Sequence, residues 1–279
     1  MQVQHGLAAD IISTLGIIAR TSSLGAIIIV VVLSYVMLLP LNFLWGMINA
    51  HQILVHVPIL NVRFPGNAML FYHYLIIIAK FDYIPTDDYF TEWFALGRAE
   101  PYSQGLENCE YGSMFMVYNM GTLFFVFFFY LLLYIVLALL HLFNLKTLRA
   151  YETLKRQLVW NWILRFLLEG CLEIAIFVCL NAIHFEFDSF GQILSFAMTV
   201  FFGLALFVGL PVLLVFLQVR YKLLKDPEYL EKYGEVYAGL KIKRLEGDDR
   251  KVLWQPALFV LRRLMFAVLA VFFKDNEIV

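Results

Sequence analysis

Charged residues are scarce in this sequence. Asp, Glu, Lys and Arg together make up 15% of its 279 residues, whereas soluble domains carry about 25%. The 21 basic and 22 acidic residues nearly cancel, to a formal net charge of −1. The composition therefore argues against a soluble domain, and it provides no excess of positive charge for binding nucleic acid.

Cysteine is scarce as well, and three cysteines form no disulfide framework. Cys171 and Cys179 lie inside an apolar segment, where we expect them to be packing side chains. Cys109 lies in a polar loop. The N-terminus has no basic stretch, and its first apolar run starts too late and is too long for a signal peptide.

Catalytic motifs are missing too. We find no nucleophile next to a base, no phosphate-binding loop, no CxxC and no HExxH. His51 and His56 are five residues apart, which is poor spacing for a metal site on a helix, and His73 and His141 are isolated. The sequence thus predicts a protein that is not an enzyme, with no catalytic, cofactor-binding or metal-binding residues.

Hydrophobic residues are what the chain has in abundance. They make up 62% of the sequence, aromatic residues reach 17%, and the mean hydropathy is +0.77. Apolar runs of about 18 residues or more predict transmembrane helices. The fold class predicted is therefore all-α: a polytopic membrane helix bundle with five or six transmembrane helices plus interfacial amphipathic helices, in one domain over residues 1–279. Its lipid bilayer is the first partner we expect.

The order of the segments can be followed along the chain. An amphipathic stretch at 1–22 comes first, a polar loop lies at 82–111, and a charged juxtamembrane stretch lies at 218–252. The segment at 68–81 is short for a span and contains His73, so the span count stays open between five and six. The predicted membrane segments are 24–48, 68–81, 112–143, 160–183, 192–217 and 253–273.

The charges of the loops predict the orientation, because Lys and Arg collect in cytoplasmic loops. Residues 144–159 carry four basic residues against one acid, and 218–252 carry nine against seven. The 82–111 loop has one basic residue and seven acids, and the 184–190 turn has two acids and no Lys or Arg. We therefore expect 144–159 and 218–252 on the cytoplasmic side and the two acidic segments outside.

The segment at 160–183, WNWILRFLLEGCLEIAIFVCLNAI, carries the most informative charges. Arg165, Glu169 and Glu173 follow one another at intervals of four residues, so on a helix they share one face. Ionisable side chains at bilayer depth are costly, and they usually face a partner or a water-filled cavity. Arg165 is nearer the membrane surface, where its side chain can extend to the headgroups.

The last predicted span supplies partners for these carboxylates. Glu169, Arg262 and Arg263 each lie nine or ten residues inside their spans, which at 1.5 Å per residue is a depth of about 13–15 Å, near the midplane. We expect Arg262 or Arg263 to pair with Glu169 or Glu173 across two helices. The five residues form a predicted intramembrane charge network, which either fixes helix packing or lines an ion pathway or charge sensor.

Several short phrases of the sequence carry a resemblance to a known family. They are LWGMINAHQ (44–52), PILNVRFPGNA (58–68), FDYIPTD (81–87), Trp160-Asn161 with Arg165 and Glu169-Gly170, Tyr233-Gly234 with Tyr237, and Leu261-Arg262-Arg263. Together they resemble the membrane region near the C-terminus of large ciliate surface proteins, whose ectodomains carry cysteine-rich, furin-like or EGF-like repeats. The resemblance covers roughly residues 24–273.

That membrane region is itself loosely similar to TRP-like and polycystin-like channels and to fungal flavin-carrier-related membrane proteins, an analogy at the level of the fold. The resemblance implies a multi-pass module of a surface-membrane protein. This chain departs from the family in two ways: it has no cysteine-rich ectodomain, and it stops just after the Arg262-Arg263 span, where family members continue with further spans. We therefore do not expect this chain to form a pore alone.

Two functions remain open at this stage. One is a membrane module that forms part of a TRP-like cation channel or sensor. The other is a non-conducting anchor or accessory subunit of a larger membrane complex, and a small-solute or lipid carrier is a third, weaker alternative. A hydrated face along Arg165, Glu169 and Glu173 would favour transport, whereas a dry face closed by Arg262 or Arg263 would favour the anchor.

Overall fold

The computed structural model describes residues 52–60, 64–66, 68–69, 72, 76, 87–96, 103–109, 111–143, 151, 155, 163–237 and 252–273. Almost all of these residues are helical, and none of them lies in a β-strand. The all-α class is thus confirmed over this part of the chain. The predicted segments at 1–22, 24–48 and 144–159, most of 68–81, and residues 238–251 lie outside the described residues or contribute only isolated positions.

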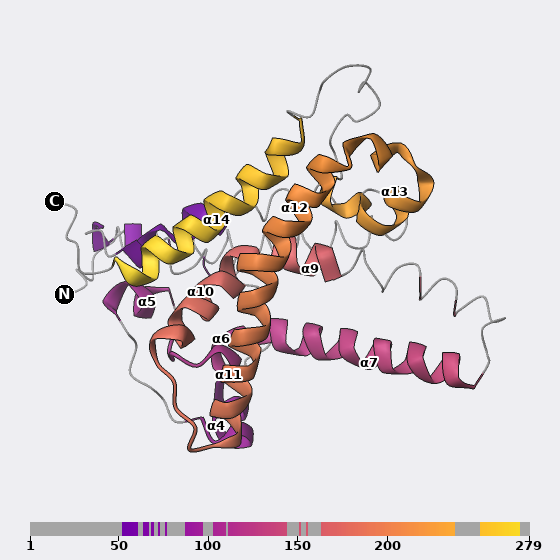
Figure 1. Cartoon of the computed structure of the whole chain (residues 1–279). Coiled ribbons are helices and arrows are strands. Elements are labelled where there is room, and N and C mark those ends of the chain that lie inside the picture. The colour runs from indigo at the N-terminus through magenta and orange to yellow at the C-terminus, as the bar shows by residue number, and fades with distance from the viewer. Residues whose placement is uncertain are drawn as a thin grey trace, which may run out of the picture. The chain divides into compact units, whose positions relative to one another are not determined.

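Within the described part of the chain, three helices are long and apolar enough to cross a membrane (Figure 1). They are α7 (Thr122–Leu142), the continuous helix Phe190–Val219, and α14 (Trp254–Phe272). They correspond to the predicted segments at 112–143, 192–217 and 253–273. In α7 only Leu123 and Phe124 are buried, so nearly its whole length has the exposed apolar surface of a lipid-facing helix.

The predicted segment at 112–143 is two helices rather than one. The short helix α6 (Met116–Met120) ends at Gly121, and α7 begins at the next residue. Gly121 has φ 46°, a conformation that side chains with a Cβ seldom adopt, so the helix is interrupted there. The long helix therefore has 21 residues, close to the length that spans a bilayer.

The segment at 160–183 is divided as well, into α9 (Ile163–Glu169) and α10 (Cys171–Ile183) with Gly170 between them. Gly170 N–H still donates to Phe166 O at 2.9 Å, and Ile174 N–H donates to Gly170 O at 2.9 Å. The bend thus keeps the helical i to i−4 hydrogen bonds, as at other glycine kinks. With 13 residues, α10 is shorter than a full span.

The helix Phe190–Val219 contains one wide turn. It consists of α11 (Phe190–Gly203), a π-helical turn η4 (Leu204–Gly209) and α12 (Leu210–Val219), and Leu210 N–H donates to Ala205 O, five residues back. Pro211 lacks an N–H, and in a regular α-helix its ring clashes with the carbonyl four residues earlier. The wider π-helical turn just before Pro211 relieves that clash. The proline therefore accounts for the position of the turn.

The chain divides into two compact units, one formed by residues 1–122, 176–199 and 266–279, and the other by 123–175 and 200–265. In the first unit a 3₁₀ turn η1 (Val57–Leu60) packs on α5 (Gln104–Asn108), and α4 (Asp87–Phe94) packs on α6. Gly191 meets Phe94 so closely that a Cβ at this position would overlap the Phe94 backbone carbonyl. The segment at 82–111, predicted as a loop, thus contains two short helices.

The second unit is built around aromatic side chains. Phe127 of α7 lies 5.1 Å from Phe202 and 6.0 Å from Phe201, both of α11, and 6.5 Å from Phe166 of α9, measured between ring centroids. After α12 the chain forms η5 (Tyr221–Lys225), α13 (Pro227–Tyr233) and η6 (Gly234–Tyr237). The described part of the predicted juxtamembrane stretch at 218–252 is thus helical from Pro227 and becomes a 3₁₀ turn after Tyr233.

Candidate functional site

The predicted charge network lies in the second unit. Arg165 and Glu169 are on α9, Glu173 is in the first turn of α10, and Arg262 and Arg263 are in the middle of α14. Since the hydrogen bonds across Gly170 preserve the helical spacing, Glu173 follows Glu169 by about one turn. No observation tests which carboxylate pairs with which arginine, so the pairing stays a prediction.

Side-chain burial increases from Arg165 through Glu169 to Glu173. The Arg165 side chain is 25% exposed and Glu169 is half-buried, whereas Glu173 has no solvent-accessible surface. Residues 171–180 of α10 are all buried. The charged face of this segment therefore begins at a partly solvated end and runs into a closed interior.

The two neighbouring arginines of α14 differ completely in burial. Arg263 is fully buried, whereas Arg262 is exposed. The guanidinium carbon of Arg263 lies 3.7 Å from the centroid of the Phe259 ring, a cation–π geometry. Its charge is also within electrostatic reach of the Glu169 carboxylate and the Cys171 thiol. Arg263 is thus the arginine that belongs with the buried part of the predicted network.

Arg165 has a contact that the sequence did not reveal. Its Nη1 lies 3.9 Å from Oε2 of Glu235 in η6, and both side chains are partly exposed, at 25% and 29%. An exposed pair at that distance contributes little, about 0.2–1 kcal/mol. Glu235 lies beside Gly234 of the Tyr233-Gly234 phrase, but nothing in its spacing from Arg165 indicated that η6 packs against α9.

An open cavity of about 180 Å³ lies next to this pair. Three polar residues line it: Glu169 of α9, Glu235 of η6 and Gln255 of α14. The rest of its wall is apolar and consists of Leu168, Val236, Pro256 and Phe259. The cavity includes the half-buried carboxylate of Glu169, whereas the buried Glu173 and Arg263 are not part of its lining.

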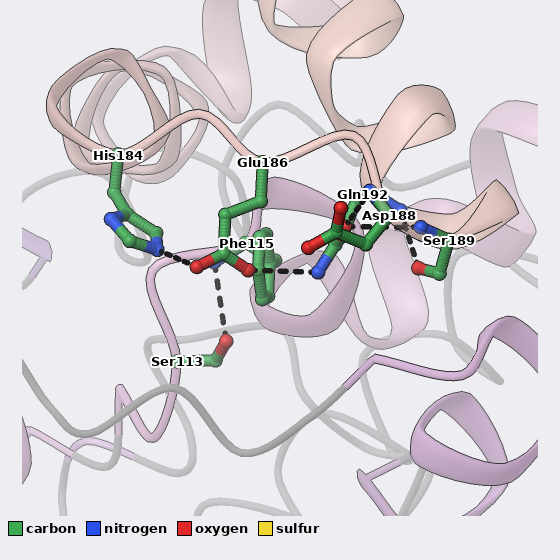
Figure 2. A network of polar contacts seen from close by, with 7 residues as sticks. All are labelled: Ser113, Phe115, His184, Glu186, Asp188, Ser189 and Gln192. Carbon is green, nitrogen blue, oxygen red and sulfur yellow. Dashed lines mark hydrogen bonds and ion pairs between the residues drawn. The ribbon is translucent and has the colours of Figure 1, made fainter.

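The turn between α10 and α11 holds a second polar group of residues, in the first unit (Figure 2). The Glu186 carboxylate accepts from Nε2 of His184 at 2.8 Å and from Nε2 of Gln192 at 2.8 Å. Oε1 of Gln192 accepts from the backbone N–H groups of Asp188 at 2.6 Å and Ser189 at 3.1 Å. Gln192 therefore holds the turn to the start of α11, and Glu186 joins His184 to it.

His56 lies in the core as part of a hydrogen-bonded group. The Gln52 carbonyl, 2.6 Å from Nδ1, can only accept, so Nδ1 carries the proton in the neutral ring. Nε2 lies 2.6 Å from the Tyr111 hydroxyl, which is then the donor. His141 likewise lies 3.0 Å from the Tyr151 hydroxyl. Among the described residues no group of three or more His, Cys, Asp or Glu side chains has the arrangement of a metal site.

Comparisons with known proteins add no relative. No protein-family model, no curated protein and no solved structure matches the chain.

Proposed function

We propose that the chain is a non-enzymatic multi-pass membrane module that serves as a non-conducting anchor or accessory subunit of a larger membrane complex. The complete burial of Glu173 and Arg263 is the observation that carries this proposal. A transport route needs water along its charged face. Here the cavity takes in Glu169, whereas Glu173 of α10 and Arg263 of α14 are enclosed by protein.

One observation favours the second candidate, a part of a TRP-like cation channel or a sensor. The π-helical turn Leu204–Gly209 lies inside a 30-residue helix that is apolar enough to span the membrane. Wide turns of this kind occur frequently at functional sites, and a change between π and α geometry rotates the part of the helix that follows.

The location belongs to the same proposal. The phrases shared with ciliate surface proteins support a plasma membrane or another surface membrane. The basic residues of 144–159 and 218–252 support a cytoplasmic position for both stretches. The apolar helices α7, Phe190–Val219 and α14 are compatible with contact to the lipid bilayer.

Cation flux from the purified full chain in liposomes separates the two candidates. The anchor proposal expects flux equal to that of empty liposomes, with folding checked by helical circular dichroism and a single size-exclusion peak. Flux above that level would overturn it and favour the channel. If flux appears, loss of flux in Glu173→Gln, with no loss in the exposed control Glu228→Gln, would connect conduction to the buried charges.

A further inference from the structure

Arg262 lies on the exposed side of α14, in the middle of the helix. Trp254, at the start of the helix, is 55% exposed, as is usual for tryptophan at a membrane interface. Arg262 follows Trp254 by eight residues, which is about 12 Å along the helix. Long basic side chains reach the headgroups from the ends of spanning helices. At this depth the charge of Arg262 therefore calls for a partner inside the membrane.

The carboxylates of the predicted spans do not serve Arg262 in this structure. Those spans contain two acidic residues, Glu169 and Glu173. Glu173 has no solvent-accessible surface, whereas Arg262 is exposed, and the Glu169 carboxylate is within electrostatic reach of Arg263. Arg263 also places a like charge within electrostatic reach of Arg262. The carboxylate that would balance Arg262 must therefore come from another molecule.

The exposed residues around Arg262 have the spacing of a contact between two helices. Residues at alternating steps of three and four form the line along which one helix packs on another. On α14 every residue of one such line is exposed, and we call this line the Arg262 face: Gln255, Leu258, Arg262, Met265, Leu269 and Phe272. The other two candidate spans, α7 and Phe190–Val219, contain no charged residue. A purely lipid-facing surface has no use for the charge of Arg262, so this face suits a helix better than lipid.

A second copy of the chain fits the Arg262 face poorly. In a two-fold symmetric dimer the same patch of both subunits meets. Because Arg262 lies in the middle of the helix, the two arginines would then face each other at the same depth. Like charges repel, and the repulsion is stronger in a medium of low dielectric constant than in water. The charge of Arg262 therefore favours a different helix, with the opposite charge at that depth.

We propose that the Arg262 face of α14 docks a transmembrane helix of another subunit, and that this helix carries an Asp or Glu near the middle of the membrane. The carboxylate pairs with the Arg262 guanidinium, and apolar side chains of the partner pack against Leu258 and Met265. Ionisable side chains inside membranes pair with one another, and polar side chains hold spanning helices together. The inference rests on the proposed accessory role of this chain, and it names the chemistry of the partner.

The test measures whether Arg262 selects a carboxylate in a neighbouring helix. The purified full chain, with a donor dye on a C-terminal tag, is reconstituted in liposomes with a Leu-rich transmembrane peptide of about 20 residues that carries an acceptor dye. The peptide has Glu, Gln or Lys at its centre, so that this residue has the depth of Arg262 in either orientation. Energy transfer should show that the Glu peptide binds about tenfold more tightly than the Gln peptide, because charge-assisted hydrogen bonds are stronger than neutral ones. The Lys peptide should bind least.

Variants of the chain connect this preference to the Arg262 face. Arg262→Gln should remove the preference for the Glu peptide, and Arg262→Glu should reverse the order, so that the Lys peptide binds most tightly. The matched control Arg220→Gln, which replaces an exposed arginine at the end of α12, should keep the preference of the natural chain. Met265→Ala should weaken binding of the Glu and Gln peptides alike, whereas Val212→Ala, at a similarly exposed residue of α12, should not.

Three results would overturn the proposal. Equal binding of the three peptides to the natural chain would mean that Arg262 faces lipid. A preference for the Glu peptide that persists in Arg262→Gln would place its cause elsewhere. Energy transfer between two differently labelled copies of the chain that disappears in Arg262→Gln would assign the Arg262 face to a second copy.

Failure of this inference is distinct from failure of the proposed function. Cation flux from the chain alone in liposomes would overturn the non-conducting role and leave the peptide preference as measured. Peptides that bind without discrimination would overturn the docking face and leave the flux result as measured.

Discussion

Arg262 and Arg263 are adjacent in sequence, yet only Arg263 is buried. A helix turns by 100° per residue, so two neighbours on α14 face different surroundings. The sequence placed both in the predicted charge network, because both have the same depth and the same charge, and it left open which of the two pairs with a carboxylate. Which one is buried depends on the orientation of α14 against α9 and α10, and no local pattern specifies that orientation.

Replacement of each arginine should therefore have a different effect on stability. Arg263→Gln should lower the free energy of unfolding by about 3 kcal/mol, because it removes a buried charge and leaves the Glu169 carboxylate without that charge. Arg262→Gln should change it by less than about 0.5 kcal/mol, as exposed substitutions usually do. Denaturant unfolding in detergent, followed by circular dichroism, measures both values.

A double-mutant cycle then tests the predicted pair. Glu169→Gln, Arg263→Gln and the double variant should give a coupling energy of at least about 1 kcal/mol, as for residues in one charge network. The same cycle with Arg262 is the control and should show no coupling. Additive effects in both cycles would contradict a pair between Glu169 and Arg263.

Tyr237, in the juxtamembrane turn η6, should make stability depend on alkaline pH. Its hydroxyl lies within hydrogen-bond distance of the carbonyls of Leu224 at 3.4 Å and Tyr229 at 3.3 Å. Burial disfavours tyrosinate and raises the pKa of Tyr237 from 10.0 to about 12. Between these values the unfolded chain releases this proton while the folded chain keeps it, so stability falls as pH rises from about 10 to about 12.

Tyr237→Phe provides the measurement for this residue. The variant should lose about 1 kcal/mol at neutral pH because its hydrogen bonds are gone. Its stability should also depend less on pH between about 10 and 12 than that of the natural chain. Tyr229→Phe serves as the control. An unchanged slope in Tyr237→Phe would contradict the assignment.

At the scale of elements, the short helix α6 depends on side chains from two later helices. Oδ1 of Asn181 accepts from Met116 N–H at 2.9 Å and from the Ser195 hydroxyl at 2.6 Å. The Ser195 hydroxyl in turn accepts from Val117 N–H at 3.3 Å. The side chain of Phe115, the N-cap residue of α6, makes no capping hydrogen bond. Asn181 and Ser195 thus perform the capping that Phe115 lacks.

Asn181→Ala should destabilise this region by about 2 kcal/mol or more. It leaves the Met116 N–H and the Ser195 hydroxyl without their acceptor in a buried place, and each unsatisfied donor costs about 1–3 kcal/mol. Hydrogen exchange at the Met116 amide should accelerate accordingly. Ser189→Ala, in the partly exposed turn of Figure 2, is the control and should leave that amide unchanged. Equal protection in both variants would contradict the capping role of Asn181.

The positions of the long helices could be predicted from the sequence, but their interruptions could not. Long apolar runs specify α7, Phe190–Val219 and α14, because only a helix satisfies the backbone in lipid. Gly121 and Gly170 look alike in such runs, yet φ at Gly121 is 46° whereas the helical hydrogen bonds continue across Gly170. At Gly170 an added Cβ would lie 2.9 Å from Cδ1 of Ile174, so this glycine is required by a close contact, whereas Gly121 is required by its φ.

At the scale of the whole molecule, part of the candidate site could be predicted from the sequence and part could not. The spacing of Arg165, Glu169 and Glu173 gave their common face, and the depth count brought in Arg262 and Arg263. Glu235, Gln255 and the cavity that they line with Glu169 were missed. They come from segments more than sixty residues away from α9 in sequence, and a cavity arises only when such segments pack. The periodicity of residues along one helix carries no information about which distant segments pack against it.

We expect this chain to cross a membrane several times, with 218–252 on one side and the 184–190 turn on the other. The helix Phe190–Val219 joins these two regions. The most direct test is labelling with a membrane-impermeant thiol reagent in sealed vesicles of known orientation, on a chain whose Cys109, Cys171 and Cys179 are replaced by Ser. Glu186→Cys and Glu228→Cys should react from opposite faces of the membrane, with Glu228→Cys on the cytoplasmic face. Labelling of both cysteines from the same face would contradict it.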